Sequence, residues 1–291
     1  MAGALAAAHY ADQAAQVDSI VNACDRLARD TFRIRCHAPA IASQIQPGQF
    51  VMIRLAGQSD PLIGRALALW DVVHGSSGQP EEIELVFIAK GKFTTLLAAQ
   101  GPGTAVTIWG PLGNGFSQAP VDHLLMVAGG IGQTPFLALA KAALGRAHYG
   151  RRPAATPFAR QVTLVYGTRS ADLLAGVDQF EAVGCRTHLC TDDGSWAPKL
   201  RVPDLLAQVL DELGPSDCRI ACCGPEPMME RVAELSSARR IPCEISLETP
   251  MACGIGICFS CVAKIRQSDG QWDYKRTCVE GPIFAAEQIV W

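Results

Sequence analysis

The sequence has little net charge and no long hydrophobic run. Charged residues make up 18% of the 291 residues, and the net charge of −3 leaves no basic face for nucleic acid. No apolar run approaches the roughly 18–20 residues that a membrane-spanning helix needs. The first basic residue is Arg26, so the start lacks the positive segment of a secretory signal. We therefore expect a cytoplasmic protein that binds neither nucleic acid nor membrane.

A disulfide framework is not expected either. Cysteines stay reduced in proteins that are not secreted, and the chain has twelve. Eight of them lie scattered in apolar surroundings and are interpreted as buried thiols: Cys24, Cys36, Cys185, Cys190, Cys218, Cys222, Cys223 and Cys243. The other four, near the C-terminus, require a separate explanation.

The first third of the chain has the pattern of a β-barrel. Residues 1–17 are rich in alanine and are expected to form a disordered N-terminus. Between residues 18 and 117, short runs rich in Val, Ile and Phe alternate with Gly/Pro turns. These runs cover 49–56, 81–91 and 105–113. They predict an antiparallel barrel with little helix.

After residue 117 the pattern changes to alternating strands and helices. In residues 118–240, an apolar run at 123–132 enters a glycine turn, and 134–147 follows with helical spacing. Such alternation predicts a doubly wound α/β nucleotide-binding domain. Residues 241–291 form a small third unit that holds the clustered cysteines. The predicted fold is therefore multi-domain: a barrel, an α/β domain and a C-terminal unit.

The cysteine cluster is the most specific motif. Cys253, Cys258 and Cys261 have the spacing Cys-x4-Cys-x2-Cys, and Cys278 follows sixteen residues after Cys261. This spacing is typical of plant-type [2Fe–2S] clusters. Structural zinc sites instead favour two separated Cys-x2–4-Cys pairs, so zinc is the weaker alternative, and unliganded thiols are the remaining one. An iron–sulfur cluster accepts single electrons and therefore needs a donor.

Two glycine turns in the α/β region could hold that donor. Gly129, Gly130 and Gly132 follow a predicted strand and precede a helix, where backbone N–H groups can bind a pyrophosphate. The segment does not match G-x-G-x-x-G, and a plain tight turn is the alternative. A second turn, Cys223-Gly224-Pro225, also follows an apolar strand. Together they indicate a nicotinamide nucleotide at the carboxyl ends of the strands.

The barrel offers a weaker candidate. Arg65 stands alone among apolar residues at a strand start, where it is either a solvated surface residue or a bidentate ligand for phosphate. The loops at 91–95 and 110–116 add backbone amides and hydroxyls at strand ends. Composition alone does not decide between these interpretations.

With these motifs together, the chain resembles the electron-transfer subunit of class 1B dihydroorotate dehydrogenase, within the ferredoxin–NAD(P)H reductase superfamily. The similarity extends from about residue 18 to 284. It is carried by the cysteine loop and by PGQFVMIR (47–54), GPLGNGF (110–116), GGIGQTP (129–135), TDDGS (191–195) and CGPEPMM (223–229). The resemblance implies FAD in the barrel, NAD(H) on the α/β domain and [2Fe–2S] in the C-terminal unit.

The resemblance also implies which residues bind the cofactors. For the barrel they are Arg65, Ala66, Leu67, Ala68, Phe87, Ile88, Gly91, Phe93 and Thr94; for the α/β domain they are Gly129, Gly130, Gly132, Thr134, Cys223, Gly224 and Pro225. Two residues depart from the family pattern. Ala68 replaces a serine, which removes a hydroxyl contact to the flavin, and Phe93 replaces a glycine at an expected close approach of backbone to cofactor.

The implied function is an electron relay without acid–base catalysis of its own. A partner subunit with FMN would oxidise dihydroorotate, in a complex with two copies of each subunit, and electrons would pass through cluster and FAD to NAD⁺ for pyrimidine synthesis. Sulfide dehydrogenase or ferredoxin–NADP transhydrogenase subunits are the alternative within the superfamily. A sensory or scaffold protein that has lost FAD is the non-enzymatic alternative.

Overall fold

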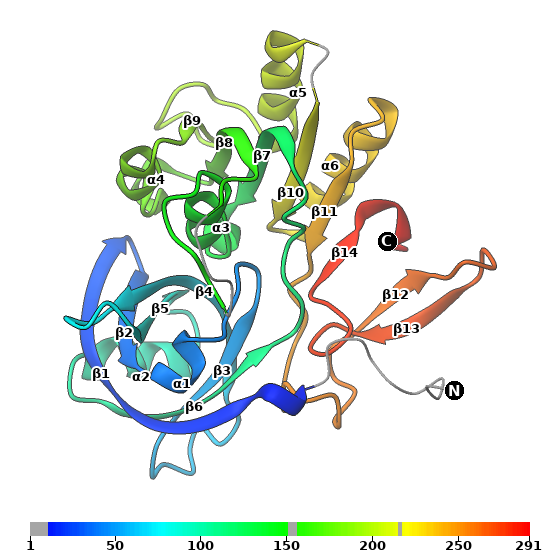
Figure 1. Ribbon diagram of the computed structural model, residues 1–291. Coiled ribbons are helices and arrows are strands. Elements are labelled where there is room, and N and C mark those ends of the chain that lie inside the picture. The colour runs from blue at the N-terminus through cyan, green and yellow to red at the C-terminus, as the bar shows by residue number, and fades with distance from the viewer. Residues whose placement is uncertain (1–10, 151–155, 215–216) are drawn as a thin grey trace.

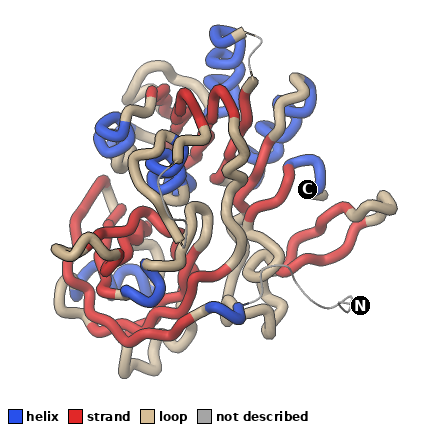
Figure 2. Tube along the Cα trace, in the orientation of Figure 1, coloured by secondary structure: helices blue, strands red, loops and turns tan. Residues whose placement is uncertain are grey.

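The fold was analysed in a computed structural model that describes residues 11–150, 156–214 and 217–291 (Figure 1). Within these ranges no helix is long and apolar enough to cross a membrane. Strands dominate the lower half of the molecule, and helices gather around the upper half (Figure 2). The first ten residues of the expected disordered N-terminus lie outside the described residues, but the short 3₁₀ helix η1 (Ala11–Gln13) and strand β1 occupy the rest.

Six antiparallel strands close into the predicted barrel, in the order β1-β2-β5-β4-β3-β6. Their bounds, from β1 to β6, are Ala15–Ala28, Thr31–His37, Phe50–Leu55, Arg65–His74, Pro80–Ile88 and Ala105–Leu112. Inward positions of adjacent strands, such as Ile34, Leu69 and Leu85, are fully buried, as period-two patterning requires. Two short helices, α1 (Pro39–Ala42) and α2 (Lys92–Gln100), complete this domain.

A six-stranded sheet in the order β14-β11-β10-β7-β8-β9 forms the α/β domain. The strands are β7 (Val121–Gly129), β8 (Ala159–Thr168), β9 (Arg186–Thr191), β10 (Cys218–Cys223), β11 (Cys243–Ser246) and β14 (Ile283–Ala285). All neighbours are parallel except β14, which is antiparallel to β11. Because β8 and β10 flank β7 on opposite sides, the strand order reverses beside β7, where doubly wound sheets bind ligands.

Helices cover both faces of this sheet, as the continuous apolar run of β7 requires. The helices are α3 (Phe136–Ala143), α4 (Val177–Val183), α5 (Val202–Leu213) and α6 (Glu226–Ala238), with the 3₁₀ helices η2 (Gly130–Gln133) and η3 (Ala171–Leu173) in the loops. Leu124 and Met126 of β7 pack in the core that contains α3. The alternate residues Leu125 and Val127 pack in the core that contains α5 and α6.

The C-terminal unit is smaller than the predicted segment 241–291. Its own sheet is a hairpin of β12 (Val262–Arg266) and β13 (Trp272–Arg276), which projects from the body of the molecule in Figure 1. The strands β11 and β14 on either side of it belong to the α/β sheet, so a boundary at residue 240 divides that sheet. The barrel likewise starts at Ala15, three residues before the expected position. The last 3₁₀ helix, η4 (Ala286–Gln288), follows β14.

Contacts between the three parts are specific. The buried carboxylate of Asp71 on β4 accepts hydrogen bonds from Tyr149 Oη at 2.6 Å and from Lys141 Nζ on α3, which joins barrel to α/β domain. The indole N–H of Trp109 on β6 donates to the carbonyl of Cys253 at 2.9 Å. This bond fixes the cysteine loop against the barrel. The fold thus brings strand ends of the barrel, the α/β sheet and the cysteine loop to one region.

Candidate functional site

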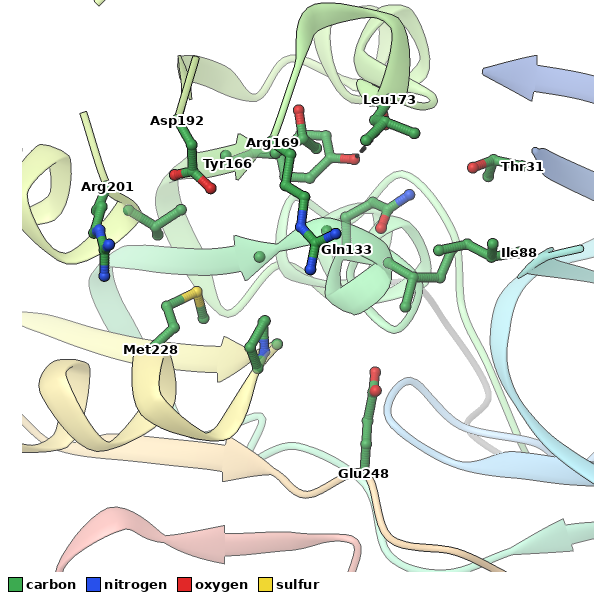
Figure 3. A pocket seen from close by; sticks show the side chains of 18 of the residues that line it. Thr31, Ile88, Gln133, Tyr166, Arg169, Leu173, Asp192, Arg201, Met228 and Glu248 are labelled. Atoms are coloured by element: carbon green, nitrogen blue, oxygen red, sulfur yellow. Dashed lines mark hydrogen bonds between the residues drawn. The ribbon is translucent and has the colours of Figure 1, made fainter. Parts of the chain in front are cut away.

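A cavity of about 780 Å³ opens at the carboxyl ends of β7, β8 and β10, against the barrel strand β5 (Figure 3). Five of the sequence-predicted residues line it: Ile88, Gly129, Gly130, Gly224 and Pro225. It coincides with the reversal of strand order beside β7, and it reaches the barrel at Ile88 and at the β1–β2 turn. A cavity of this volume is within the range of sites for small ligands and cofactors.

Close packing explains why glycine occupies key positions in the turns that form the cavity. A Cβ on Gly132 would lie 2.2 Å from the carbonyl oxygen of Cys223, and one on Gly129 would lie 2.5 Å from Met228 Sδ. A Cβ on Gly224 would lie 3.0 Å from the amide nitrogen of Gly129. The turns after β7 and β10 therefore touch through their main chains, which leaves their outer surfaces free for a ligand.

Several predicted residues support the cavity from behind without lining it. Gly132, Thr134 and Cys223 are buried, as is Phe87 in the barrel. The carbonyl of Ile131 accepts a hydrogen bond from the amide of Thr134 at 3.1 Å within the η2 turn. None of these four buried residues is among those that line the cavity in this conformation. Their place in the structure is to shape the turns.

Unpaired charges line the upper part of the cavity. Arg169 follows β8, Arg201 precedes α5, and both line the cavity wall beside Asp192 (Figure 3). Among the described residues neither arginine forms an ion pair. Cations free of partners on a cavity wall suit an anionic ligand such as a dinucleotide pyrophosphate. No motif in the sequence signalled Arg201.

Glu248 lies on the opposite wall, immediately before the cysteine loop (Figure 3). Glu248 is an exposed residue whose carboxylate opens onto the cavity; desolvation by the protein around it raises its pKa, and the Cys223 thiol, 3.7 Å away, lowers it in part. Burial, then the charge of Glu248, raises the pKa of Cys223 well above its ordinary value, so this thiol stays neutral. The sequence missed Glu248, although its position five residues before Cys253 was available as a signal.

The predicted flavin residues lie on two adjoining barrel elements. Arg65 begins β4 and is exposed, and its guanidinium donates to the carbonyls of Ile63 at 2.8 Å and Gly64 at 3.0 Å. Helix α2 begins directly after Gly91, and its Lys92 pairs with Asp60 in the loop that leads to β4. The exposed guanidinium and the free amides of a helix N-terminus therefore share one edge of the barrel, which fits a bound phosphate chemically.

Phe93 does not occupy the position that its replacement of glycine suggested. Its side chain is fully buried in the barrel core, so it does not stand over the N-terminus of α2. The expectation of a side chain at the close backbone approach was wrong, because the first turn of α2 directs this residue inward. Thr94 caps the same helix: its hydroxyl oxygen accepts from the amides of Lys90 and Gly91, each at 3.1 Å. Ala66 and Ala68 on β4 are half-buried.

Three of the four predicted metal ligands lie in one loop and the fourth, Cys278, follows β13; the four differ in exposure. Cys261 and Cys278 are each 1% exposed and pack with Met52 and Leu112 of the barrel, whereas Cys258 is exposed. Gly254 and Gly256 have φ of +74° and +83°, which only glycine adopts without strain. The thiols contact one another as two pairs, Cys253 with Cys258 and Cys261 with Cys278. In the described residues no group of three or more ligands is drawn together in metal-binding geometry.

The surroundings of two of these thiols, Cys258 and Cys261, favour the thiolate that iron requires. The amide of Ile255 donates to Cys253 Sγ at 3.4 Å, and the Ser260 hydroxyl lies 3.1 Å from Cys258 Sγ. Hydrogen bonds from Ser260 lower the pKa of Cys258 to about 6. The Cys278 thiol does the same for Cys261, whose pKa also falls to about 6, and correspondingly holds its own proton more tightly. Four sulfur donors with backbone amides around them fit an iron–sulfur cluster.

Comparisons with known proteins define the class of this site. Residues 126–234 match the oxidoreductase NAD-binding domain, and residues 248–290 match the iron–sulfur cluster binding domain of dihydroorotate dehydrogenase B. Among solved structures, a chain of the NADH-dependent reduced ferredoxin–NADP oxidoreductase, studied for flavin-based electron bifurcation, superposes with a TM-score of 0.76. It is 26% identical and covers 94% of this chain and 90% of its own. Phthalate dioxygenase reductase, at 15% identity and TM-score 0.57, shares the fold. The chain is an oxidoreductase with a ferredoxin-reductase fold and an iron–sulfur module.

Two relatives narrow this class to a family. The electron transfer subunit of dihydroorotate dehydrogenase B from Desulforamulus reducens is 34% identical over 275 residues, 94% of this chain and 98% of its own. The corresponding subunit from Geobacillus kaustophilus is 35% identical over 267 residues, 91% of this chain and 94% of its own. The chain belongs to the family of dihydroorotate dehydrogenase B electron transfer subunits.

Proposed function

We propose that the chain passes electrons between NAD(H), FAD and a [2Fe–2S] cluster, and so links dihydroorotate oxidation on a partner subunit to NAD⁺ reduction. The observation that carries this proposal is that the nucleotide cavity reaches both the barrel and the segment that leads into the cysteine loop. The cavity runs from the strand ends of the α/β sheet to Ile88 of the barrel, and its wall residue Glu248 leads directly into the cysteine loop. One segment of main chain therefore joins the nucleotide cavity to the cluster ligands.

The residues assigned here all bind a cofactor, and no acid–base pair is among them. Gly129, Gly130 and Gly224 present main chain to a dinucleotide, and Arg169 and Arg201 neutralise its phosphates. Arg65 and the N-terminus of α2 would hold the pyrophosphate of FAD. Flavin chemistry would supply the change from two-electron to one-electron transfer that joins a nicotinamide to an iron–sulfur cluster. The protein supplies binding, orientation and exclusion of water.

Cys253, Cys258, Cys261 and Cys278 would ligate the cluster, and the loop around them sets its surroundings. Thr277 is fully buried, and its amide and hydroxyl donate to the carbonyl of Cys261 at 2.8 and 3.0 Å. Its hydroxyl also bonds that of Thr249, the residue after Glu248. This contact ties the buried pair of ligands to the wall of the nucleotide cavity, so the relative position of the two sites is fixed by hydrogen bonds.

The partner in this proposal is the FMN-containing catalytic subunit, with two copies of each chain in the complex. The family name, electron transfer subunit, supports a separate catalytic subunit. All twelve cysteines are free thiols, which suits the reducing cytoplasm in which we place this complex.

A second candidate is a flavoprotein subunit that serves another redox complex, of the sulfide dehydrogenase or ferredoxin–NADP transhydrogenase type. The 0.76 TM-score to the ferredoxin–NADP oxidoreductase chain favours it. Both candidates share the relay and differ in the partner that exchanges electrons with the cluster.

Reconstitution with the cognate FMN subunit separates these candidates. The purified chain and that subunit are mixed without oxygen, and NADH formation is followed on addition of dihydroorotate and NAD⁺. Each subunit alone serves as the control and should form no NADH. The expected result is NADH formation that requires both subunits and is lost in the Cys258→Ser variant. A complex that reduces NAD⁺ only with reduced ferredoxin or sulfide would contradict the proposal and support the second candidate.

A further inference from the structure

The β12–β13 hairpin exposes one face that is both aromatic and basic. Because paired residues of antiparallel strands share a face, the register Val262–Arg276, Lys264–Tyr274 and Arg266–Trp272 places these six side chains on one side. We call them the hairpin face. The opposite side carries Ala263 and Ile265, which pack in the α/β core. One side of the hairpin is thus anchored, and the other faces outward.

Large exposed side chains are concentrated here. Trp272 is 48% and Tyr274 53% exposed on the hairpin face, and Phe259 and Ile257 of the adjoining cysteine loop are 62% and 68% exposed. They are four of the eight large hydrophobic residues that the described part of the chain exposes. Exposed aromatics that gather on one surface mark protein interaction sites far more often than scattered ones do.

These aromatics are held in fixed positions before any partner binds. The rings of Trp272 and Tyr274 meet edge to face at 5.3 Å, and Lys264 Nζ lies 5.2 Å from the centre of the Trp272 ring. The Arg276 guanidinium lies 5.2 Å from the Phe259 ring and donates to the carbonyl of Gly256 at 3.0 Å. Pre-ordered aromatic side chains lose little entropy on binding, which is a property of interface anchors.

The charge of the hairpin face is positive, against the net charge of −3 for the whole chain. Lys264 and Arg266 form no ion pair with any described residue, and no acidic residue shares their face. Arg276 is paired with Glu280 at 3.3 Å. On the opposite side, Asp273 is balanced by Lys275 at 3.8 Å. Two uncompensated cations beside aromatic anchors suit an acidic protein surface.

The position of this surface relates it to electron transfer. Phe259 stands between the exposed ligand Cys258 and the buried ligand Cys261, and its φ of +56° is unusual for a bulky residue. A strained backbone that holds an aromatic ring in solvent points to a function for that ring. Electron transfer slows steeply with distance, and a partner seated on this loop would contact the segment that carries the exposed Cys258.

We propose that the hairpin face, with Ile257 and Phe259, is the docking surface for an acidic patch of the FMN catalytic subunit. This inference rests on the proposed function, which names that partner, and adds where it binds and by which chemistry. Trp272, Tyr274 and Phe259 are the anchors, and Lys264 and Arg266 guide the approach. Binding is therefore expected to weaken as salt concentration rises.

The test compares charge reversal on this surface with matched reversal elsewhere. Lys264→Glu with Arg266→Glu is compared with Arg146→Glu and Lys199→Glu, two exposed residues outside any ion pair of the described chain. Affinity for the FMN subunit is measured by titration calorimetry at two salt concentrations. We expect at least 10-fold weaker binding for the hairpin variant and loss of most of the salt dependence, with the control near wild type. Cluster absorbance and NADH reduction of the flavin, which need no partner, should be unchanged in both.

A second pair of variants replaces tryptophan and therefore tests the surface without a change of charge. Trp272→Ala is compared with Trp196→Ala, whose indole is equally exposed at 49%. We expect only the Trp272 variant to lose affinity. Equal binding by wild type and both hairpin variants would overturn the docking surface while leaving the proposed function standing. A hairpin variant that alters the oligomeric state of the isolated chain would assign the surface to self-association and overturn it too. Failure of the wild-type chain to bind the FMN subunit would overturn both proposals.

Discussion

The nucleotide cavity and the cysteine loop are built by different means. The cavity is shaped by main chain in contact with main chain, as at Gly132 and Cys223, and the elements behind it are buried. Of the four clustered cysteines, Cys261 in the loop and Cys278 after β13 are buried, whereas Cys253 is half-buried and Cys258 is exposed. Packing thus shapes the cavity without a ligand, whereas the outer half of the loop depends on what its thiols hold. A substitution should act through sterics in one region and through ligation in the other.

The largest effect is expected from the four cysteines proposed as cluster ligands. Cys258→Ser and Cys278→Ser should each reduce iron and sulfide from about two of each per chain to near zero, because a [2Fe–2S] cluster needs four thiolates. The flavin should still be reduced by NADH. Iron and sulfide assays check this, with Cys24→Ser as the control outside the loop. Bound zinc in place of iron would support the zinc alternative instead.

Phe93→Gly tests whether the phenylalanine that replaces the family's glycine serves to pack the barrel core. Because Phe93 is fully buried, the free energy of unfolding should fall by about 3–5 kcal/mol. Phe93→Leu, which keeps an apolar side chain, should cost less than about 1.5 kcal/mol. Denaturant unfolding monitored by circular dichroism measures both. Tighter FAD binding with unchanged stability in the glycine variant would show that the side chain faces the cofactor after all.

Gly132→Ala tests the claim that main-chain contact shapes the cavity. The new Cβ would meet the Cys223 carbonyl oxygen at 2.2 Å, so the turns after β7 and β10 must separate. We expect a loss of about 1–3 kcal/mol in stability and weaker NADH binding. Gly130→Ala has no heavy atom within 4 Å of its Cβ but a φ of +57°, so it should cost only about 1 kcal/mol. Fluorescence titration and unfolding curves distinguish the two, and equal effects would contradict the account.

Glu248→Gln gives a smaller effect whose sign depends on pH. Desolvation by the surrounding protein raises the pKa of Glu248, so the folded state binds its proton more tightly than the unfolded state does. The stabilisation that comes from this tighter proton binding is fully present at pH values below the pKa of Glu248 in the unfolded chain. It is lost as pH rises through the higher pKa of Glu248 in the folded state. The glutamine variant lacks this loss, so its stability relative to wild type should increase as pH rises above the ordinary pKa of a glutamate. Unfolding midpoints across that range measure it; a constant difference would show that Glu248 does not titrate there.

Ala68→Ser should have the smallest effect. It restores the hydroxyl that the family pattern places on β4, at a half-buried position where a serine fits. One added hydrogen bond should tighten FAD binding about 2- to 5-fold. The measurement is the FAD dissociation constant from flavin fluorescence. Weaker binding would indicate that β4 holds the flavin differently from the family.

Much of the fold follows from local patterns. The predicted strands at 49–56, 81–91 and 105–113 correspond to β3, β5 and β6, because period-two burial and Gly/Pro turns are local signals. The boundary at residue 240 failed for a non-local reason. Strand β14, from the end of the chain, pairs with β11, and no pattern in the sequence of either strand specifies that partner.

The cavity residues that could be predicted from the sequence are those whose position depends on backbone geometry. Gly129, Gly130 and Gly224 line the cavity because turns at strand ends have a recognisable sequence. Glu248 and Arg201 were missed because a single charged residue looks the same in sequence whether it faces solvent or a cavity. Phe93 was misjudged for the same reason: the side of α2 that it occupies depends on the barrel beneath. The roles of the predicted flavin and cluster residues remain predictions.

The most direct test of the relay is rapid mixing of the FAD- and iron-loaded chain with NADH, without oxygen and without any partner. Absorbance is followed at wavelengths for flavin and for cluster. We expect flavin reduction first and cluster reduction after it within the same chain. We also expect Cys258→Ser to keep the first phase and lose the second. Flavin reduction in the wild type with a cluster that never receives electrons would contradict the claim that the cavity and the cysteine loop form one electron path.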